Sequence, residues 1–392
     1  MAYDPKTGKG LGSLYRSDSR VMTHREWKGF KDTLYDFGRW LKCYGFIGWT
    51  LGGHPILLVR SMLRYRWMLS YLTAANMIDR HTIGLRGKEL RYVHEELFAL
   101  VHNATINVKK ILERDEHLRP NSRKAKKLRE NTVMFDEMTP SNIMWGFPTL
   151  DWMDIAMMTI GMPGEIDQQA NVYYIDRIEE FGMAADVCPL PAAECGAAVV
   201  DDYPILGKTY ITSTMPCDGS IGQTTFMGRY FRHLPIYQIT PPQRFNEPEV
   251  QEFAVHNLKG CIAFIEKNYG VINCTDYPQV CGAALSLTRE YEFQGAGCMD
   301  PYLYKAQLKT TEMAKKGYEE DAAKGVKNYR HRAIVWACPA HYYTNFTYWA
   351  EHCWGVKTLV DMECMLSYHM YHIGDKEQAL IDMASSYERM MM

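Results

Sequence analysis

The sequence predicts an α/β protein built on parallel sheets, because the same alternation of strands and helices is found in two separate stretches of the chain. Short runs rich in β-forming residues alternate with helical segments over residues 208–239 and again over 332–361. A strand–helix–strand order places its two strands parallel in one sheet. The chain has 392 residues, which is enough for two or three domains of roughly 100–200 residues each. We therefore expect two α/β units.

The N-terminal third is predicted to be mostly helical. After a polar lead-in over residues 1–20, apolar residues recur at helical spacing in Trp27–Cys43, Ile56–Ile78 and Leu90–Leu112. The apolar stretch Cys43–Val59 is shorter than the ~18 residues of a membrane span, and we expect a buried turn between helices there. The basic run Arg119–Arg129 is interpreted as a solvated linker, with a nucleic-acid patch as the alternative.

The first α/β unit is predicted from residue 208 onward. Lys208–Ser213 is typical of a strand, and a turn containing Pro and Gly follows at Met215–Gly219. Ile221–Arg232 is predicted to be a helix, and Pro235–Ile239 a second strand. The strand–helix–strand order favours a parallel pair.

A long helix and a second unit complete the chain. Asn246–Tyr269 carries an apolar stripe, with Pro248 in its first turn and Gly270 at its end. A polar helix is expected near Tyr302–Lys327. The second unit is predicted to comprise a strand, a helix and a strand, at Arg332–Cys338, Tyr343–Cys353 and Lys357–Asp361.

These elements predict four regions. They are a helical N-terminal extension (1–130), a first α/β domain with candidate ligand cysteines (131–245), a helical connector (246–328) and a second α/β domain (329–392). Each α/β domain is expected to have a Rossmann-like or flavodoxin-like parallel sheet. The second has only two predicted strands, whereas four to six are typical, so we expect it to be incomplete in this sequence.

Composition excludes several classes of protein. The 44 basic and 46 acidic residues give a net charge of −2, which argues against a nucleic-acid binder. Met1–Gly10 is polar and no apolar leader segment follows it. With 11 cysteines, an odd number, we expect a cytoplasmic, reducing location where the cysteines are thiols or metal ligands.

Three cysteines lie near predicted strand ends, where open parallel sheets bind ligands. Cys217 follows the strand that ends at Ser213, Cys338 ends the strand of the second unit, and Cys188 lies in a proline-broken stretch after a helix at Val172–Gly182. A loop thiolate can ligate a metal without competing with the hydrogen bonds of a sheet. From spacing alone, a small buried apolar residue is a commoner role for each cysteine than a metal ligand.

Common short motifs are absent. The sequence contains no CxxC pair, no GxxxxGK[ST] or GxGxxG phosphate loop and no GxSxG elbow. His341 with His352, and His369 with His372, have spacings that suit a metal, although core or surface roles are commoner. Cys217 beside Asp218 is an alternative nucleophile arrangement, and an unrelated cysteine or zinc enzyme stays open.

The order of several longer segments resembles the 2-hydroxyacyl-CoA dehydratase and benzoyl-CoA reductase family, in its larger-type subunit. The resemblance covers residues 133–392 and leaves the N-terminal extension unmatched. The matching segments are, in order, TVMFDEMTPSNIMWGF, YYIDRIEEFGMAADVC, PLPAAECG, TYITSTMPCDG, RHLPIYQITPPQRF, EVQEFAVHNLKGCIAFIEKNYG, YRHRAIVWACPAHYYTNF and GVKTLVD.

The resemblance implies a cofactor, partners and ligands. Family members pair two homologous subunits, each with a [4Fe-4S] cluster on three cysteines, and receive an electron from an ATP-hydrolysing iron–sulfur activator. Cys188 matches the first ligand and Cys217 the second. The third family ligand lies beyond GVKTLVD and has no counterpart here, so Cys338 is the nearest substitute in the chain. Cys195 falls where the family usually has an apolar residue.

The expected function is delivery of a low-potential electron to a CoA thioester, forming a ketyl radical. Dehydration of an (R)-2-hydroxyacyl-CoA is the first expectation within the family, because its members are the more numerous. Reductive dearomatisation of an aromatic acyl-CoA, as in benzoyl-CoA reductase, is the alternative. A non-catalytic or electron-relay subunit is a further alternative, because the third ligand is missing.

Overall fold

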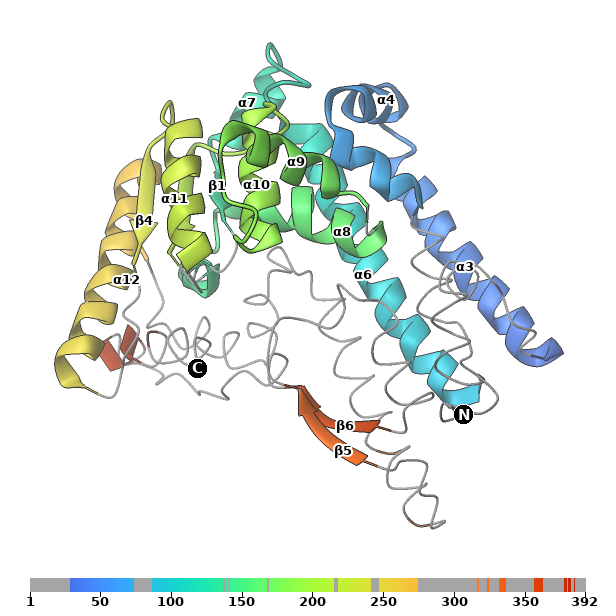
Figure 1. Cartoon of the computed structure of the whole chain (residues 1–392). Helices are drawn as coiled ribbons and strands as arrows, with labels where there is room; N and C mark the ends of the chain where they lie inside the picture. The colour runs from blue at the N-terminus through green and yellow to red at the C-terminus, as the bar shows by residue number, and fades with distance from the viewer. Residues whose placement is uncertain are drawn as a thin grey trace.

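A computed structural model describes most of the first 273 residues. Described are 29–73, 87–136, 139, 141–167, 169–214, 218–240 and 247–273, and beyond them 316, 323, 331–335, 356–361, 377–378, 380–381 and 384. Figure 1 shows the arrangement of these elements, with a row of helices packed around a short parallel sheet.

The central feature is a parallel sheet of four strands, in the order β2-β1-β3-β4. The strands are β1 (Thr132–Phe135), β2 (Asp151–Asp154), β3 (Thr209–Ser213) and β4 (Ile236–Ile239). Every residue of β1 and β3 is buried, as expected when helices cover both faces. The α/β class and the predicted strands at 208–213 and 235–239 are confirmed, whereas β1 and β2 were not predicted.

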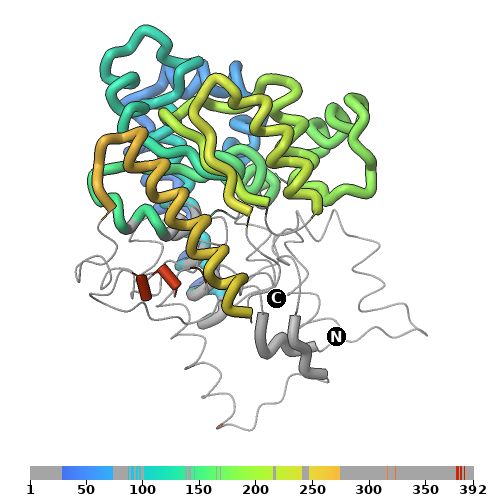
Figure 2. The backbone as a smooth tube through the Cα atoms, turned by 90° about the vertical axis from the view of Figure 1, so that its left-hand side faces the viewer, coloured from blue at the N-terminus to red at the C-terminus, as the bar shows by residue number. Residues whose placement is uncertain are grey.

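Alternate residues of β1 point to the two faces of the sheet. Met134 joins a core with α10 (Pro189–Val199), α11 (Asp218–Tyr230) and the N-terminal helices. Val133 and Phe135 join a second core with α12 (Pro248–Tyr269). The sheet is therefore the middle layer of three, as Figure 2 shows from the side of α12.

The N-terminal helices share the first of these cores. They are α3 (Phe30–Leu51), α4 (Pro55–Arg64), η1 (Arg66–Thr73), α6 (Gly87–Arg114) and α7 (Arg123–Arg129). Tyr65, Trp67 and Ile111 are at most 1% exposed and pack in the same cluster as Tyr210 of β3. The helical character expected for the N-terminal third is confirmed within 30–73 and 87–114, and these helices cover the sheet.

Two expectations for this region are wrong in detail. The chain is helical through Leu51, so only Gly52–His54 form the turn expected over Cys43–Val59. The basic run is not a linker, because Arg123–Arg129 forms α7, whose Ala125 and Arg129 are buried. Arg129 donates to the carbonyl oxygen of Arg114 at 2.7 Å, which explains how a basic residue is placed inside.

Within the described helices, none combines the length and apolar character that a membrane crossing requires.

The helix predicted at Asn246–Tyr269 is confirmed with a small shift at its start. Glu247 is the N-cap and Pro248 the first helical residue, since proline lacks the N–H that this position leaves unused. The helix ends at Gly270, which has a left-handed φ of 66°.

The second unit is described only in part. β5 (His331–Val335) and β6 (Val356–Asp361) pair in parallel as a separate two-stranded sheet, which confirms both predicted strands. The helix expected at Tyr343–Cys353 lies outside the described residues. So does most of the helix expected at 302–327, where Lys316 and Ala323 are helical. The predicted domain boundaries stay a prediction.

Close packing of α9 (Val172–Phe181) on α10 depends on one glycine. A Cβ added at Gly196 would overlap the backbone carbonyl of Tyr174, which belongs to the neighbouring helix. By contrast, a Cβ added at Gly222 of α11 meets no atom within 4 Å.

We expect Gly196→Ala to lower the free energy of unfolding by about 1–3 kcal/mol, because two backbones must separate. Gly222→Ala is the matched control, and should be neutral or raise stability by up to about 1 kcal/mol, since alanine is the better helix former. Urea unfolding followed by circular dichroism measures both variants. Equal midpoints would contradict the close approach.

A second test concerns the ion pairs that tie α6 to β2. Asp151 accepts from Lys110 Nζ at 2.7 Å and from Arg114 Nη2 at 2.5 Å. Burial raises the pKa of Asp151, but the two cations outweigh burial and the net pKa is lowered. The stabilisation is therefore complete above the ordinary aspartate pKa of about 3.9 and is lost as the pH falls below it.

Asp151→Asn should therefore destabilise the chain more at pH 6 than at pH 3.5. Urea unfolding at the two pH values measures this difference, with Asp186→Asn, at an exposed position, as the control. A loss that is the same at both pH values would show that the charge of Asp151 is unimportant.

Candidate functional site

The candidate site lies at the carboxyl edge of the four-stranded sheet. Parallel α/β sheets bind ligands at this edge because the loops after the strands and the starts of the helices converge there. α11 begins on this edge, which faces downward in Figure 1. Asp136 directly follows β1, and Thr212 and Ser213 end β3.

Asp136 is the centre of a buried hydrogen-bond network at this edge. Its Oδ2 accepts from the Thr212 hydroxyl at 2.8 Å, and its Oδ1 accepts from the Gln223 amide at 2.9 Å. The Thr224 hydroxyl lies 3.1 Å from that of Thr212 and donates to the Ser213 carbonyl at 2.6 Å. Asp136 is completely buried, and Thr212, Gln223 and Thr224 are at most 3% exposed. The network joins β1, β3 and α11.

A second buried carboxylate comes from α10. Glu194 is 1% exposed, and its Oε2 accepts from the same Gln223 amide nitrogen that donates to Asp136. Small residues surround Glu194 on α10, so the helix packs closely enough for its side chain to reach α11. Burying two carboxylates beside one neutral amide is costly. Such costly groups are frequent at functional sites.

Three protonated groups lie near these carboxylates. Burial first, and then the charges of Glu194 and Asp136, raise the pKa values of Tyr203 and Tyr210 well above that of an ordinary tyrosine. The same causes raise the pKa of Cys195. Without a metal bound, Cys195 is therefore a thiol at neutral pH. The surroundings of the two carboxylates are phenols and a thiol.

Cys188 lies at the start of α10, as its N-cap. The stretch around it is not a loop broken by prolines, as expected, because Pro189 occupies the first helical position and the helix continues from there. Cys188 is half-buried. It precedes Glu194 by six residues, or about 9 Å along the helix axis. The positive end of the helix dipole favours negative charge there.

The other predicted ligands lie outside the described residues. Cys217 falls between Thr214, which follows β3, and Asp218, where α11 begins. Cys338 follows the end of β5 at Val335, and His341, His352, His369 and His372 are likewise not described. Among the residues that are described, no three His, Cys, Asp or Glu side chains form a group suited to a metal ion. Cys188 and Cys217 as ligands stay a prediction.

Sequence reasoning did not single out Asp136, Glu194 or Gln223. One signal was available for Asp136, because an acidic residue directly follows the apolar run Val133–Phe135. Glu194 is an isolated acid in the small-residue run AAECGAA, which indicates a buried charge once the helix is known. Nothing in the sequence pairs Gln223 with either.

Comparison with known proteins finds no match: no family model and no curated protein sequence is similar to this chain. The class that fold and site define is an α/β protein with a parallel sheet and a buried carboxylate pair at its carboxyl edge.

The shared amide of Gln223 provides a test of the carboxylate network. Gln223→Leu should lower the free energy of unfolding by about 1–3 kcal/mol at pH 7, because both buried carboxylates lose a donor. Thr225→Ala, on the exposed side of the same helix, should change it by less than about 0.5 kcal/mol. Chemical denaturation of both variants measures the difference. Equal stabilities would show that the Gln223 amide does not hold the carboxylates together.

Proposed function

We propose that this chain is the iron–sulfur subunit of an acyl-CoA enzyme, similar to the larger-type subunit of the 2-hydroxyacyl-CoA dehydratase and benzoyl-CoA reductase family. The observation that carries the proposal is the position of Cys188, at the start of α10 on the carboxyl edge of a parallel sheet. The Cys217 segment joins the end of β3 to the start of α11 at that same edge.

The chemistry of the described cysteines supports this choice of ligand. An iron–sulfur cluster needs thiolates that can reach it. Cys43, Cys195 and Cys261 are at most 1% exposed, whereas Cys188 is half-buried. Burial raises the pKa of Cys43 to about 11, so that thiol stays protonated at neutral pH. Of these four cysteines, Cys188 best fits a cluster ligand.

In the proposed reaction, the cofactor supplies an electron and the protein positions the side chains around it. A bound [4Fe-4S] cluster supplies the low-potential electron that forms a ketyl radical from a CoA thioester. The chain places Cys188 at the start of α10. It also keeps a pair of carboxyl groups, Asp136 and Glu194, in a buried network that excludes water from this part of the edge.

The proposal includes a finer fold and named partners. In this proposal the chain has two Rossmann-like or flavodoxin-like domains, and the second contains β5 and β6. A homologous second subunit and an ATP-hydrolysing iron–sulfur activator are its partners, in the cytoplasm. Support for a partner comes from the large apolar side chains that α3 exposes. They include Phe30, Leu34, Phe37, Leu41 and Trp49, each at least 49% exposed.

The first test is cluster content in the full chain purified without oxygen together with its native partner. Iron, acid-labile sulfide and low-temperature EPR should show about four irons per chain and a reducible cluster. Cys188→Ser and Cys217→Ser should each remove most of this iron, because each removes a ligand. Cys43→Ala is the control, and should keep the iron at a small cost in stability.

Full iron content in both serine variants would contradict the assignment. Iron confined to the partner would instead make this chain an electron-relay or non-catalytic subunit. Assays with a 2-hydroxyacyl-CoA and with benzoyl-CoA then separate the dehydratase from the reductase.

A further inference from the structure

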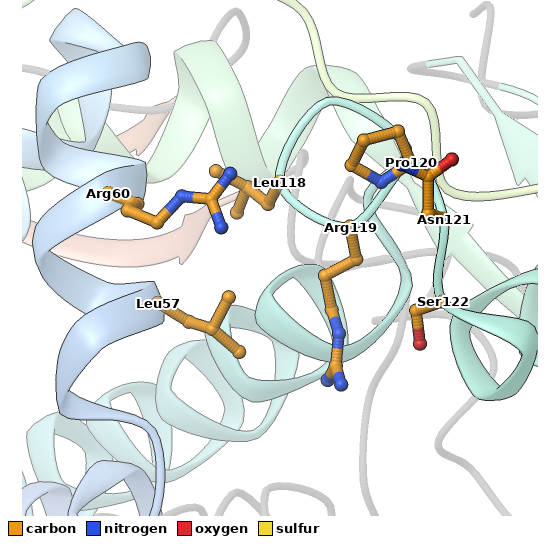
Figure 3. A pocket seen from close by; sticks show the side chains of 7 residues that line it. All are labelled: Leu57, Arg60, Leu118, Arg119, Pro120, Asn121 and Ser122. Atoms are coloured by element: carbon orange, nitrogen blue, oxygen red, sulfur yellow. The ribbon is translucent and has the colours of Figure 1, made fainter.

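A shallow basic pocket lies at the opposite end of the sheet from Asp136. It is formed between α4 and the loop that joins α6 to α7, with a volume of about 580 Å³. Its lining residues are Leu57, Arg60, Leu118, Arg119, Pro120, Asn121 and Ser122, all labelled in Figure 3. This loop leads through α7 into the first residue of β1, so the pocket is at the amino edge of the sheet.

Two guanidinium groups border the pocket from different elements. Arg60 extends from α4 toward Leu118, while Arg119 extends from the loop past Ser122 (Figure 3). In the described part of the chain, neither forms an ion pair with a carboxylate. The neighbouring arginines differ, because Arg64 pairs with Asp201 at 2.8 Å and Arg114 with Asp151 at 2.5 Å. The pocket therefore carries uncompensated positive charge.

Exposed basic residues of α7, the helix that follows the loop, add to this positive charge. α7 exposes Arg123, Lys124, Lys126 and Lys127 beside the pocket. Since the whole chain has a net charge of −2, these cations are a local concentration and not a general excess. A local field of this kind draws anions toward the surface that it faces.

The loop is held in one conformation before any ligand arrives. Arg119 N donates to the Asp115 carbonyl at 3.0 Å, and the Ser122 Oγ accepts from Ala125 N at 3.2 Å. Leu118, next to Arg119, is 2% exposed and anchors the loop in the core. A preformed site loses less entropy when it binds.

We propose that this pocket binds the phosphate groups of a small phosphorylated ligand of the nucleoside diphosphate class. Guanidinium groups hold phosphate oxygens through paired hydrogen bonds, and the Asn121 amide and Ser122 hydroxyl add donors. Leu57 and Pro120 provide apolar walls for the organic part. The volume lies within the ~300–1,000 Å³ of small-molecule sites. The proposal is independent of the proposed function.

The test is calorimetric titration of the full chain with ADP and with pyrophosphate. We expect both to bind, ADP more tightly, because only ADP can use the apolar walls. Arg60→Ala and Arg119→Ala should each weaken ADP binding about tenfold or more, since each removes a charge-assisted contact. Thermal unfolding of each variant checks that the fold is kept.

Two controls separate the pocket from general charge. The double variant Lys126→Ala/Lys127→Ala removes two exposed cations from the next helix, and Lys31→Ala removes one from the far end of α3. Lys31→Ala should bind ADP within about threefold of the parent chain, and the α7 double variant should lose less affinity than either pocket variant. No ADP binding at millimolar concentration, or equal affinity in the pocket variants and the parent, would overturn the proposal. So would a larger loss in the α7 variant than in the pocket variants, which would indicate a surface for an acidic polymer.

Discussion

Two buried aspartates hold the sheet to the helices that precede it. Asp202 Oδ2 accepts from the Tyr174 hydroxyl at 2.5 Å and from Arg66 N at 3.0 Å, and its carbonyl accepts from the Trp67 indole at 2.8 Å. Asp115 accepts from the Tyr65 hydroxyl at 2.5 Å and from Ile205 N at 3.1 Å. Asp202 lies in the connection between α10 and β3, and Asp115 binds that connection through Ile205 N. Both carboxylates therefore fix the position of this connection.

These contacts determine where α10 points. The connection over residues 200–208 is held at the amino edge, so α10 must run from the carboxyl edge toward it. That direction places Cys188 at the carboxyl edge and Glu194 within reach of Gln223. Burial raises the pKa values of Asp115 and Asp202, and their hydrogen bonds act in the opposite direction. The candidate site thus depends on polar contacts on the far side of the sheet.

The sequence predicted the elements whose local signals agree with their final environment. β3, α11, β4 and α12 have apolar periodicity, a Pro/Gly turn and clear helix ends, and all four were found. β1 and β2 have four residues each, and Asp151–Asp154 has an acidic residue at each end with only two apolar residues between them. Their strand conformation comes from pairing, which a local pattern does not record. α7 was missed because a basic heptapeptide is typical of solvated chain.

The site was less predictable than the fold. Cys188 was singled out, but as a loop residue, because prolines at 189 and 191 suggested a broken chain where proline in fact starts the helix. The carboxylate network joins residues 136, 194 and 223 from three elements. Such a network is a property of the packed sheet, and no spacing in the sequence encodes it.

The last described helical residues have a consequence for synthesis on the ribosome. Leu380 and Ala384 are at most 2% exposed and complete the core beneath α12, and Lys259 of α12 pairs with Glu377 at 2.6 Å. Figures 1 and 2 both place these residues beside α12. Residues that lie more than a hundred positions after α12 in the sequence therefore complete the outer layer of the first sheet. At translation rates of about 5–20 residues per second, the apolar face of α12 that these residues cover stays exposed for on the order of ten seconds. During that interval the nascent chain is exposed to chaperones and to aggregation.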